Sequence, residues 1–127
     1  MNTTIEIQNK QQTIETEHCR VEWVKRPQWS RLPFEGCIGV GGKVFLDLEH
    51  LVVAMLRFQP HAAIHEHAAP FDIDVICVEG AGFTSVNGDC ATLQAGQKVR
   101  WPAHLAHRLW TESTTMITLM VEHPQNK

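Results

Sequence analysis

The sequence lacks three features that would place it in a large class of proteins at once. It has no run of Lys or Arg, and its 11 basic residues are outnumbered by 14 acidic ones, for a net charge of −3, so we expect no nucleic-acid partner. No apolar stretch reaches the ~18 residues of a membrane-spanning helix, so we expect no membrane partner. The N-terminal MNTTIEIQNK has neither the basic nor the apolar segment of a secretory signal, which favours a cytoplasmic protein.

The cysteines also lack the spacing of a metal or redox motif. Cys19, Cys37, Cys77 and Cys90 form no C-x-x-C pair, which argues against a zinc ribbon, and we expect reduced thiols. The chain contains no phosphate-binding loop, no dinucleotide-binding fingerprint and no evident Ser-His-Asp or Cys-His arrangement. Nucleotide-dependent and covalent nucleophilic chemistry therefore have no supporting motif.

The sequence does contain a succession of short strand patterns. With 127 residues, 43% of them apolar, the chain suits a single domain over residues 1–127 with its own core. Asn87-Gly88-Asp89 is a strong hairpin-turn signal. Frequent turns between short strands predict an all-β sandwich or barrel. The strands are expected at 19–24, 37–40, 43–48, 73–78, 83–86, 90–93, 98–101, 107–110 and 114–121.

Other segments allow more than one interpretation. Residues 1–18 are polar and could form a loose arm or an edge strand. The prolines of residues 25–34 predict a loop, and Gly41-Gly42 predicts a turn. Residues 47–58 fit either a helical stripe or a strand. We favour the strand, because Val52-Val53 is β-branched and the neighbouring segments are strand-like.

Histidines concentrate in two stretches, PHAAIHEH and RWPAHLAHRLW. His65 and His67 are two residues apart, and side chains at that spacing point to the same face of a regular strand. His104 and His107 follow in the second stretch. Imidazoles from two strands that meet at one point could bind a metal ion.

The same stretches resemble the small single-domain members of the cupin superfamily. The first cupin motif is H-x-H, three or four residues, Glu, six residues and Gly. It corresponds here to His65-Glu66-His67, followed by Asp72 and Gly80. The second motif is Gly, a short strand, P-x-G, two residues and His, and it corresponds to GQKVRWPAHLAH over residues 96–107. The two motifs lie within residues 60–110.

The chain departs from this pattern at the carboxylate of the first motif. Asp72 stands where the motif has Glu, and one additional residue separates it from Gly80, so that counting back from Gly80 reaches Ile73. A bulge could bring either Asp72 or Asp74 into a site. In the second motif, His104 stands where the motif has Gly.

The resemblance implies a cupin-type double-stranded β-helix, a jelly-roll barrel, with a divalent transition metal inside. Imidazole and carboxylate ligands suit Fe, Mn, Ni, Zn or Cu. The implied metal ligands are His65, His67, His107 and Asp72, with Asp74 as the alternative carboxylate. The candidate substrate-contacting residues are His104, Arg57 and Trp101, and His61 is a further candidate near the mouth.

Cupins of this pattern imply a metal-dependent enzyme that acts on a small molecule, with dioxygenase- or isomerase-like chemistry. The alternative is a non-catalytic module that holds a small ligand or a metal, and a third interpretation is a structural barrel whose histidines bind nothing. We also expect a homodimer, because small cupins generally pair through sheets or edge strands, and residues 4–24 could supply an exchanged strand.

Overall fold

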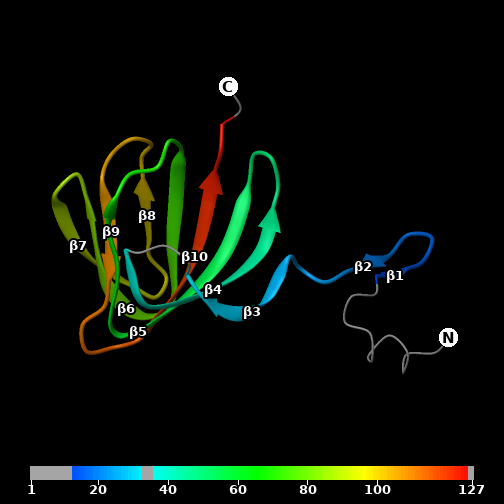
Figure 1. The fold of residues 1–127 in the computed structure, drawn as a ribbon, viewed down its shortest axis with the longest axis horizontal. Helices are drawn as coiled ribbons and strands as arrows, with labels where there is room; N and C mark the ends of the chain where they lie inside the picture. The colour runs from blue at the N-terminus through cyan, green and yellow to red at the C-terminus, as the bar shows by residue number, and fades with distance from the viewer. Residues whose placement is uncertain (1–12, 33–35, 126–127) are drawn as a thin grey trace.

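The computed structural model describes residues 13–32 and 36–125, and in these ranges it contains strands and turns but no helix (Figure 1). The all-β expectation is confirmed. Without a helix, these ranges also hold no helical segment that could cross a membrane. The strands are β1 (Ile14–Glu15), β2 (Arg20–Val21), β3 (Arg26–Arg31), β4 (Cys37–Asp47), β5 (Val52–His67), β6 (Asp72–Val86), β7 (Asp89–Gln94), β8 (Lys98–Trp101), β9 (His107–Trp110) and β10 (Met116–His123).

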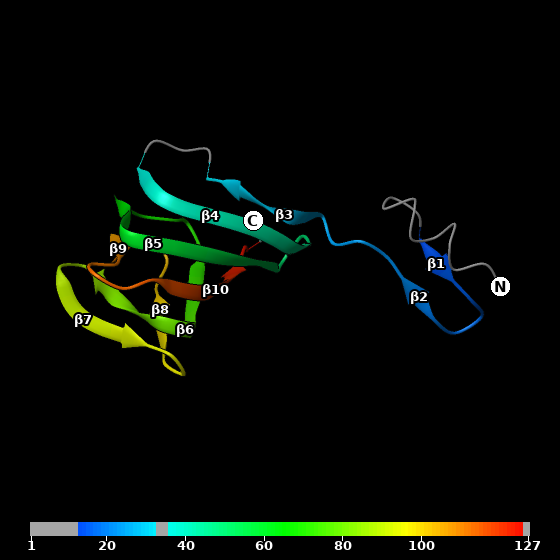
Figure 2. The same ribbon diagram turned by 90° about the horizontal axis from the view of Figure 1, so that it is seen from below.

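The architecture depends on two long strands that each belong to two layers. The first half of β5 pairs with β10 and its second half with β9. The first half of β6 pairs with β10 and β8, and its second half pairs with β9 and β7. One layer therefore has the order β3-β4-β5-β10-β6-β8, and the other the order β5-β9-β6-β7. Figure 2 shows β4 and β5 on one side of the resulting jelly roll and β7 and β8 on the other.

The long strands bend where the backbone takes a left-handed conformation. Gly80 in the middle of β6 has a φ of 79°, and Gly39 in β4 has a φ of 68°. A Cβ at Gly80 would collide with the backbone carbonyl oxygen of Thr115, so glycine is required there. The expected Gly-rich connection at residues 79–82 is therefore a bend within one continuous strand.

The core fills the space between the layers. On β10, Met116, Thr118 and Met120 are buried, as the alternation of residues 114–121 predicts. Phe58 and Leu109, from β5 and β9, are fully buried. Removing a side chain as large as Phe58 from such a core costs about 3–5 kcal/mol. This packing holds β5, β9 and β10 in the positions from which the site is built.

The structure corrects two local predictions. The expected loop over residues 25–34 is wrong, because Arg26–Arg31 form β3; this strand lies at the edge of its layer, where the missing N–H of Pro27 is tolerated. The expected turn at Gly41-Gly42 is also wrong, because β4 runs through it. A Cβ at Gly42 would lie 3.1 Å from side-chain atoms of Leu56, so glycine permits close packing here. The strand preferred for residues 47–58 is confirmed from Val52 onward, and residues 48–51 form a turn.

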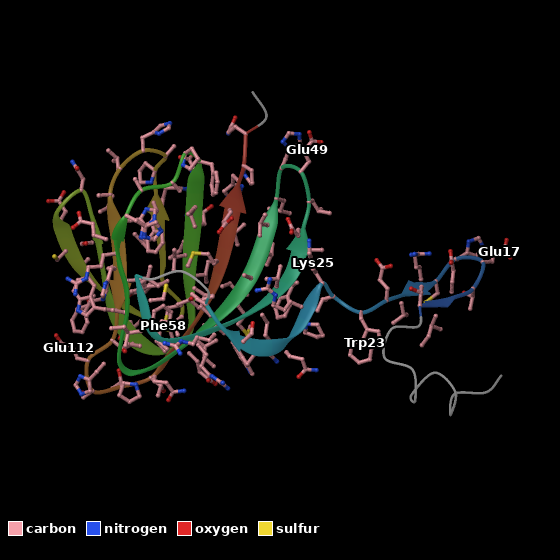
Figure 3. The ribbon with its side chains drawn as sticks, viewed as in Figure 1. Glu17, Trp23, Lys25, Glu49, Phe58 and Glu112 are labelled. Atoms are coloured by element: carbon pink, nitrogen blue, oxygen red, sulfur yellow. The ribbon has the colours of Figure 1, made fainter. Side chains whose placement is uncertain are left out.

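The N-terminal segment stands apart from the jelly roll. β1 and β2 form a separate two-stranded sheet, and of the strand expected at 19–24 only Arg20–Val21 is present. Figure 3 shows Trp23 on the connection between this hairpin and β3, away from the jelly roll. The side chain of Trp23 is 50% exposed. Residues 1–12 of the expected arm lie outside the described residues.

Candidate functional site

A cavity of about 180 Å³ lies between the two layers. Its walls are mostly aliphatic, and three of the groups that line it are ionisable. These features suit a small ligand with an apolar body, because polar groups in such pockets are few and fix orientation. The lining residues are Leu32, Val44, Val52, Ala54, Leu56, Ile64, His67, Ile73, Trp101, His107, Met120 and Glu122.

His107, the first residue of β9, is the most unusual group of the cavity. Its side chain is 1% exposed, and neither ring nitrogen has a partner within ordinary hydrogen-bond distance and angle among the described residues, although the backbone of Leu105 lies near enough to raise the pKa of the ring and so partly oppose the effect of burial. The ring stacks on Trp101 with centroids 3.9 Å apart, and the Trp101 indole N–H donates to Thr84 Oγ1 at 3.0 Å. Burial, with a contribution from His67, lowers the pKa of His107 to about 4. At neutral pH the imidazole is therefore uncharged, which is the form that binds metals.

His67, the last residue of β5, lies against His107. The two ring centroids are 4.6 Å apart and the ring planes are inclined at 73°. Nδ1 of His67 lies 2.9 Å from the backbone oxygen of His65. When Nδ1 donates to that carbonyl, Nε2 carries the lone pair, as in many metal-binding histidines.

His65 does not line the cavity. The pairing of β5 with β9 shifts register between Ile64 and His67, so that both of these residues line the cavity. A regular strand would instead place His65 and His67 on one face. The backbone N–H of His65 donates to the carbonyl of Gly36 at 2.7 Å. Its role as a metal ligand stays a prediction.

Asp72 and Asp74 are also absent from the cavity lining, since the alternation of β6 turns Ile73 inward. Asp72 accepts a hydrogen bond from the backbone N–H of Ala103 at 2.8 Å. Asp74 accepts one from Arg100 Nε at 2.7 Å, and Lys98 and His123 also contact it. The Arg100 guanidinium, above all, holds the pKa of Asp74 well below its usual range.

The structure brings Trp101 to the cavity but not the other predicted substrate-contacting residues. His104 is exposed, with a φ of 70°, and its backbone N–H donates to the carbonyl of Ala69 at 2.7 Å. His61 is exposed at the bend of β5, with a φ of 59°. Arg57 is exposed on the outer face of its layer, with its guanidinium 4.4 Å from the ring centroid of Trp29.

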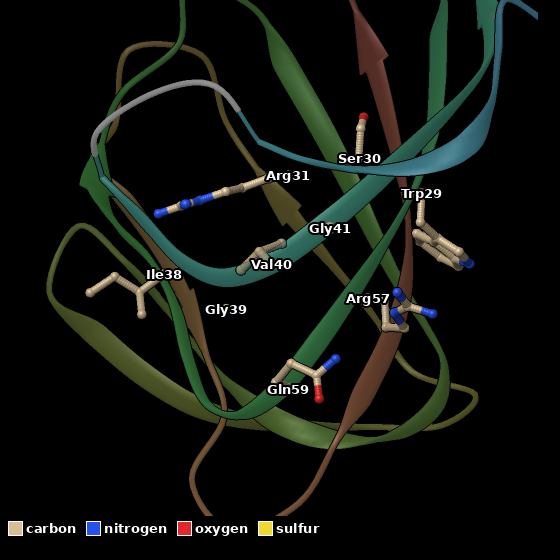
Figure 4. A pocket seen from close by; sticks show the side chains of 9 residues that line it. All are labelled: Trp29, Ser30, Arg31, Ile38, Gly39, Val40, Gly41, Arg57 and Gln59. Carbon is tan, nitrogen blue, oxygen red and sulfur yellow. The ribbon is translucent and has the colours of Figure 1, made fainter.

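Arg57 belongs to a separate surface groove of about 400 Å³ formed by β3, β4 and β5 (Figure 4). Lys43 also lies over the Trp29 ring, 4.7 Å from its centroid. In Figure 4 the guanidinium of Arg31 lies toward the Ile38 end of the groove. The groove is open to solvent and lies on the outside of the layer that carries the cavity on its inner face.

Glu122, on β10, lines the cavity and was missed by the sequence analysis. Burial raises its pKa, and the neighbouring Asp47 adds to the effect. The signal was present, because Glu122 continues the inward alternation of Met116, Thr118 and Met120 by one step. The strand was predicted to end at residue 121, whereas β10 continues to His123, so the prediction stopped one residue before Glu122.

The cavity contains imidazole nitrogens, a ligand type that transition metals prefer, but fewer of them than a complete metal site has. His107 presents two buried nitrogens without partners, and His67 adds a second imidazole beside it. Within residues 13–32 and 36–125, however, no group of three or more His, Cys, Asp or Glu side chains is arranged to hold a metal ion. The cavity thus offers two ligands, with further coordination positions left for other groups.

The sequence and the fold of the chain were compared with those of known proteins. No protein-family model matches the sequence, and no curated protein sequence matches it. Among solved structures, the chain is similar to a cupin 2 conserved barrel domain protein from Leptotrichia buccalis, with 23% identity and a TM-score of 0.64; the match covers 66% of this chain and 40% of that one. It is also similar to an RmlC-like cupin from Shewanella frigidimarina, with 20% identity and a TM-score of 0.69 over 88% of this chain and 95% of that one.

A third similar structure is the polyketide cyclase RemF from Streptomyces resistomycificus, with 14% identity and a TM-score of 0.71 over 77% of this chain and 74% of that one. The chain spans less than half the length of the Leptotrichia protein. It spans nearly all of the Shewanella cupin. Together with the two-layer arrangement of β5 and β6, these matches show that the chain has the cupin fold.

Proposed function

We propose that this chain is a metal-binding cupin whose internal cavity acts on a small molecule. The observation that carries the proposal is His107, an imidazole in the cavity wall whose two nitrogens are buried and have no hydrogen-bond partner of ordinary geometry in the part of the chain that the structure describes. A buried polar atom without a partner costs about 1–3 kcal/mol. A group retained at that cost is best explained by a ligand that it binds, such as a metal ion.

His67 and His107 would hold the metal, and His65, two residues along β5, is the nearest predicted third ligand. A bound Fe, Mn, Ni, Zn or Cu ion would act as a Lewis acid or, for the redox-active metals, support oxygen chemistry. The aliphatic walls would hold the apolar body of the substrate and exclude water from it. The cavity, at about 180 Å³, is smaller than the ~300 Å³ at which drug-sized pockets begin, which favours a compact substrate.

Metal analysis of the protein purified without chelator tests the first part of this proposal. We expect about one transition metal ion per chain, and loss of most of it in the variants His67→Ala and His107→Phe. His18→Ala is the matched control, because His18 is exposed on the hairpin formed by β1 and β2. If the parent protein binds none of the five metals after incubation with each, the metal-dependent function is refuted.

A non-catalytic ligand-binding cupin is the second candidate. This candidate is favoured by the predominantly apolar cavity wall, and because the described residues contain no group of three side chains arranged to hold a metal ion. The two functions differ in turnover. A binding module should show ligand-dependent thermal stabilisation without product formation, whereas an enzyme should convert the ligand when loaded with its metal and lose that activity in His67→Ala.

A further inference from the structure

Glu122 provides a carboxyl group in the cavity lining. It lies beside Ile73, the position at which the first cupin motif has a glutamate when counted back from Gly80. Counting back from Gly80 reaches Ile73, which is 4% exposed and lines the cavity. Glu122 is the cross-strand partner of Ile73 on β10, and it lines the same cavity. Cross-strand partners lie side by side on one face of a sheet. The cavity therefore receives its carboxyl from β10 and not from β6.

No permanently charged cation opposes this carboxyl group. The cavity lining contains no Lys or Arg. Arg57 lies against Trp29 on the outer face, and Arg100 is bound to Asp74. Arg57 was predicted as a substrate-contacting residue, but among the described residues of the cavity wall there is no Arg that could bind an anionic substrate.

We infer that Glu122 selects the ligand of this cavity, by accepting a hydrogen bond from a hydroxyl or amino group and by repelling a carboxylate or phosphate at that end. The ligand class is then a compact neutral or cationic molecule with an apolar body and a hydrogen-bond donor. This inference rests on the proposed function only in that the cavity is the ligand site. It does not depend on the identity of the metal.

The surroundings of Glu122 support this selectivity. Val52 and Ile73 flank it on the neighbouring strands, so its immediate cross-strand contacts are apolar. Asp47, which is paired with Lys25 at 2.9 Å, is a further negative charge that acts on Glu122. An anionic ligand would add a further negative charge to this region, whereas a donor would satisfy the carboxyl oxygen.

The test uses three probes with one carbon chain, n-butylammonium, 1-butanol and butyrate. Each is titrated into the purified protein, with its metal content measured in parallel, and the indole N–H resonance of Trp101 reports binding in the cavity. We expect butyrate to bind at least about tenfold more weakly than n-butylammonium. Glu122→Gln should reduce this ratio about tenfold, and Glu122→Lys should favour butyrate. Glu79→Gln, which removes an exposed carboxylate of β6, should leave the ratio unchanged.

Two results would overturn the inference. The first is an unchanged probe ratio in Glu122→Gln, or butyrate as the tightest probe of the parent protein. The second is that none of the probes perturbs Trp101, which would also remove the cavity as the ligand site. Because metal content is measured separately, that second result differs from a failure of metal binding.

Discussion

Replacing His107 with Phe should stabilise the metal-free protein while removing its metal-binding nitrogens. Phe has a similar shape and can keep the stacking on Trp101 and the edge contact with His67, which have centroid distances of 3.9 Å and 4.6 Å. It removes two buried nitrogens that have no partner among the described residues. Each such atom costs about 1–3 kcal/mol. Since a water molecule in the cavity could satisfy one of them, we expect a gain of about 1–3 kcal/mol in unfolding free energy at pH 7.

The pH dependence of stability gives this prediction a second measurable part. The pKa of His107 is lowered from 6.5 to about 4 in the folded protein, so between these values the unfolded chain binds a proton that the folded chain does not. Stability of the parent protein therefore falls as the pH falls from 6.5 to 4, by up to about 3 kcal/mol. The variant His107→Phe lacks this group and should lose correspondingly less stability over the same interval.

Urea unfolding of chelator-treated protein, followed by circular dichroism at pH 7, 5 and 4, measures both parts. The slope of unfolding free energy against urea should be the same in parent and variant, which shows that the unfolded states are comparable. His18→Phe, on the exposed hairpin, should change little. A variant less stable than its parent at pH 7, or one with the same pH dependence, would show that the nitrogens of His107 are satisfied in the folded protein.

Three further predictions concern the fold and the assembly. Asp74→Asn should lower the unfolding free energy by about 1–3 kcal/mol in urea at pH 7, because it weakens the hydrogen-bonded pairing with Arg100. Since the pKa of Asp74 is depressed, its contribution is fully present above pH ~4 and declines progressively as the pH falls below that value; a parent protein whose advantage over Asp74→Asn does not shrink between pH 5 and pH 2 would contradict this. Gly80→Ala should unfold at a markedly lower temperature than Gly88→Ala, because both have a positive φ but only at Gly80 does a Cβ meet backbone atoms; equal melting temperatures would rule out that clash. Light scattering at micromolar concentration should give the mass of a homodimer that deletion of residues 1–24 weakens, and a monomeric mass for the full chain would refute the predicted pairing.

The all-β jelly-roll fold could be predicted from the sequence, but the length of its strands could not. Alternation divided residues 114–121 between two faces, and the structure shows that the face with Met116, Thr118 and Met120 is the one that packs against the core. Prolines and glycines were misleading for the same physical reason. Pro27 is tolerated at a sheet edge, and Gly80 bends a strand that continues through it. Local sequence does not report which of these tertiary contexts applies.

In the candidate site, too, some residues could be predicted from the sequence and others depend on how the strands pair. Trp101, His67 and His107 were predicted and lie together at the cavity, because the two motifs contain the parts of β5, β8 and β9 that carry them. The expected common face of His65 and His67 depends on a regular strand, and the register shift after Ile64 lies beyond what a two-residue spacing can reveal. Glu122 was missed since it is distant from both motifs in sequence and becomes a neighbour of Ile73 only through strand pairing.

The buried polar atoms that lack a partner among the described residues support the proposed ligand site independently of the sequence motifs. Two of the buried polar side chains form specific hydrogen bonds: Thr84 accepts from Trp101, and Thr111 donates to the carbonyl of Gln59 at 2.6 Å. The buried side-chain atoms without a partner among the described residues are the two nitrogens of His107 and the hydroxyl of Thr118. Both residues lie in the interior of the jelly roll. Folding alone would favour apolar side chains at such positions. Of the two residues only His107 lines the cavity, so the proposed ligand leaves the Thr118 hydroxyl without an explanation but accounts for the buried nitrogens of His107.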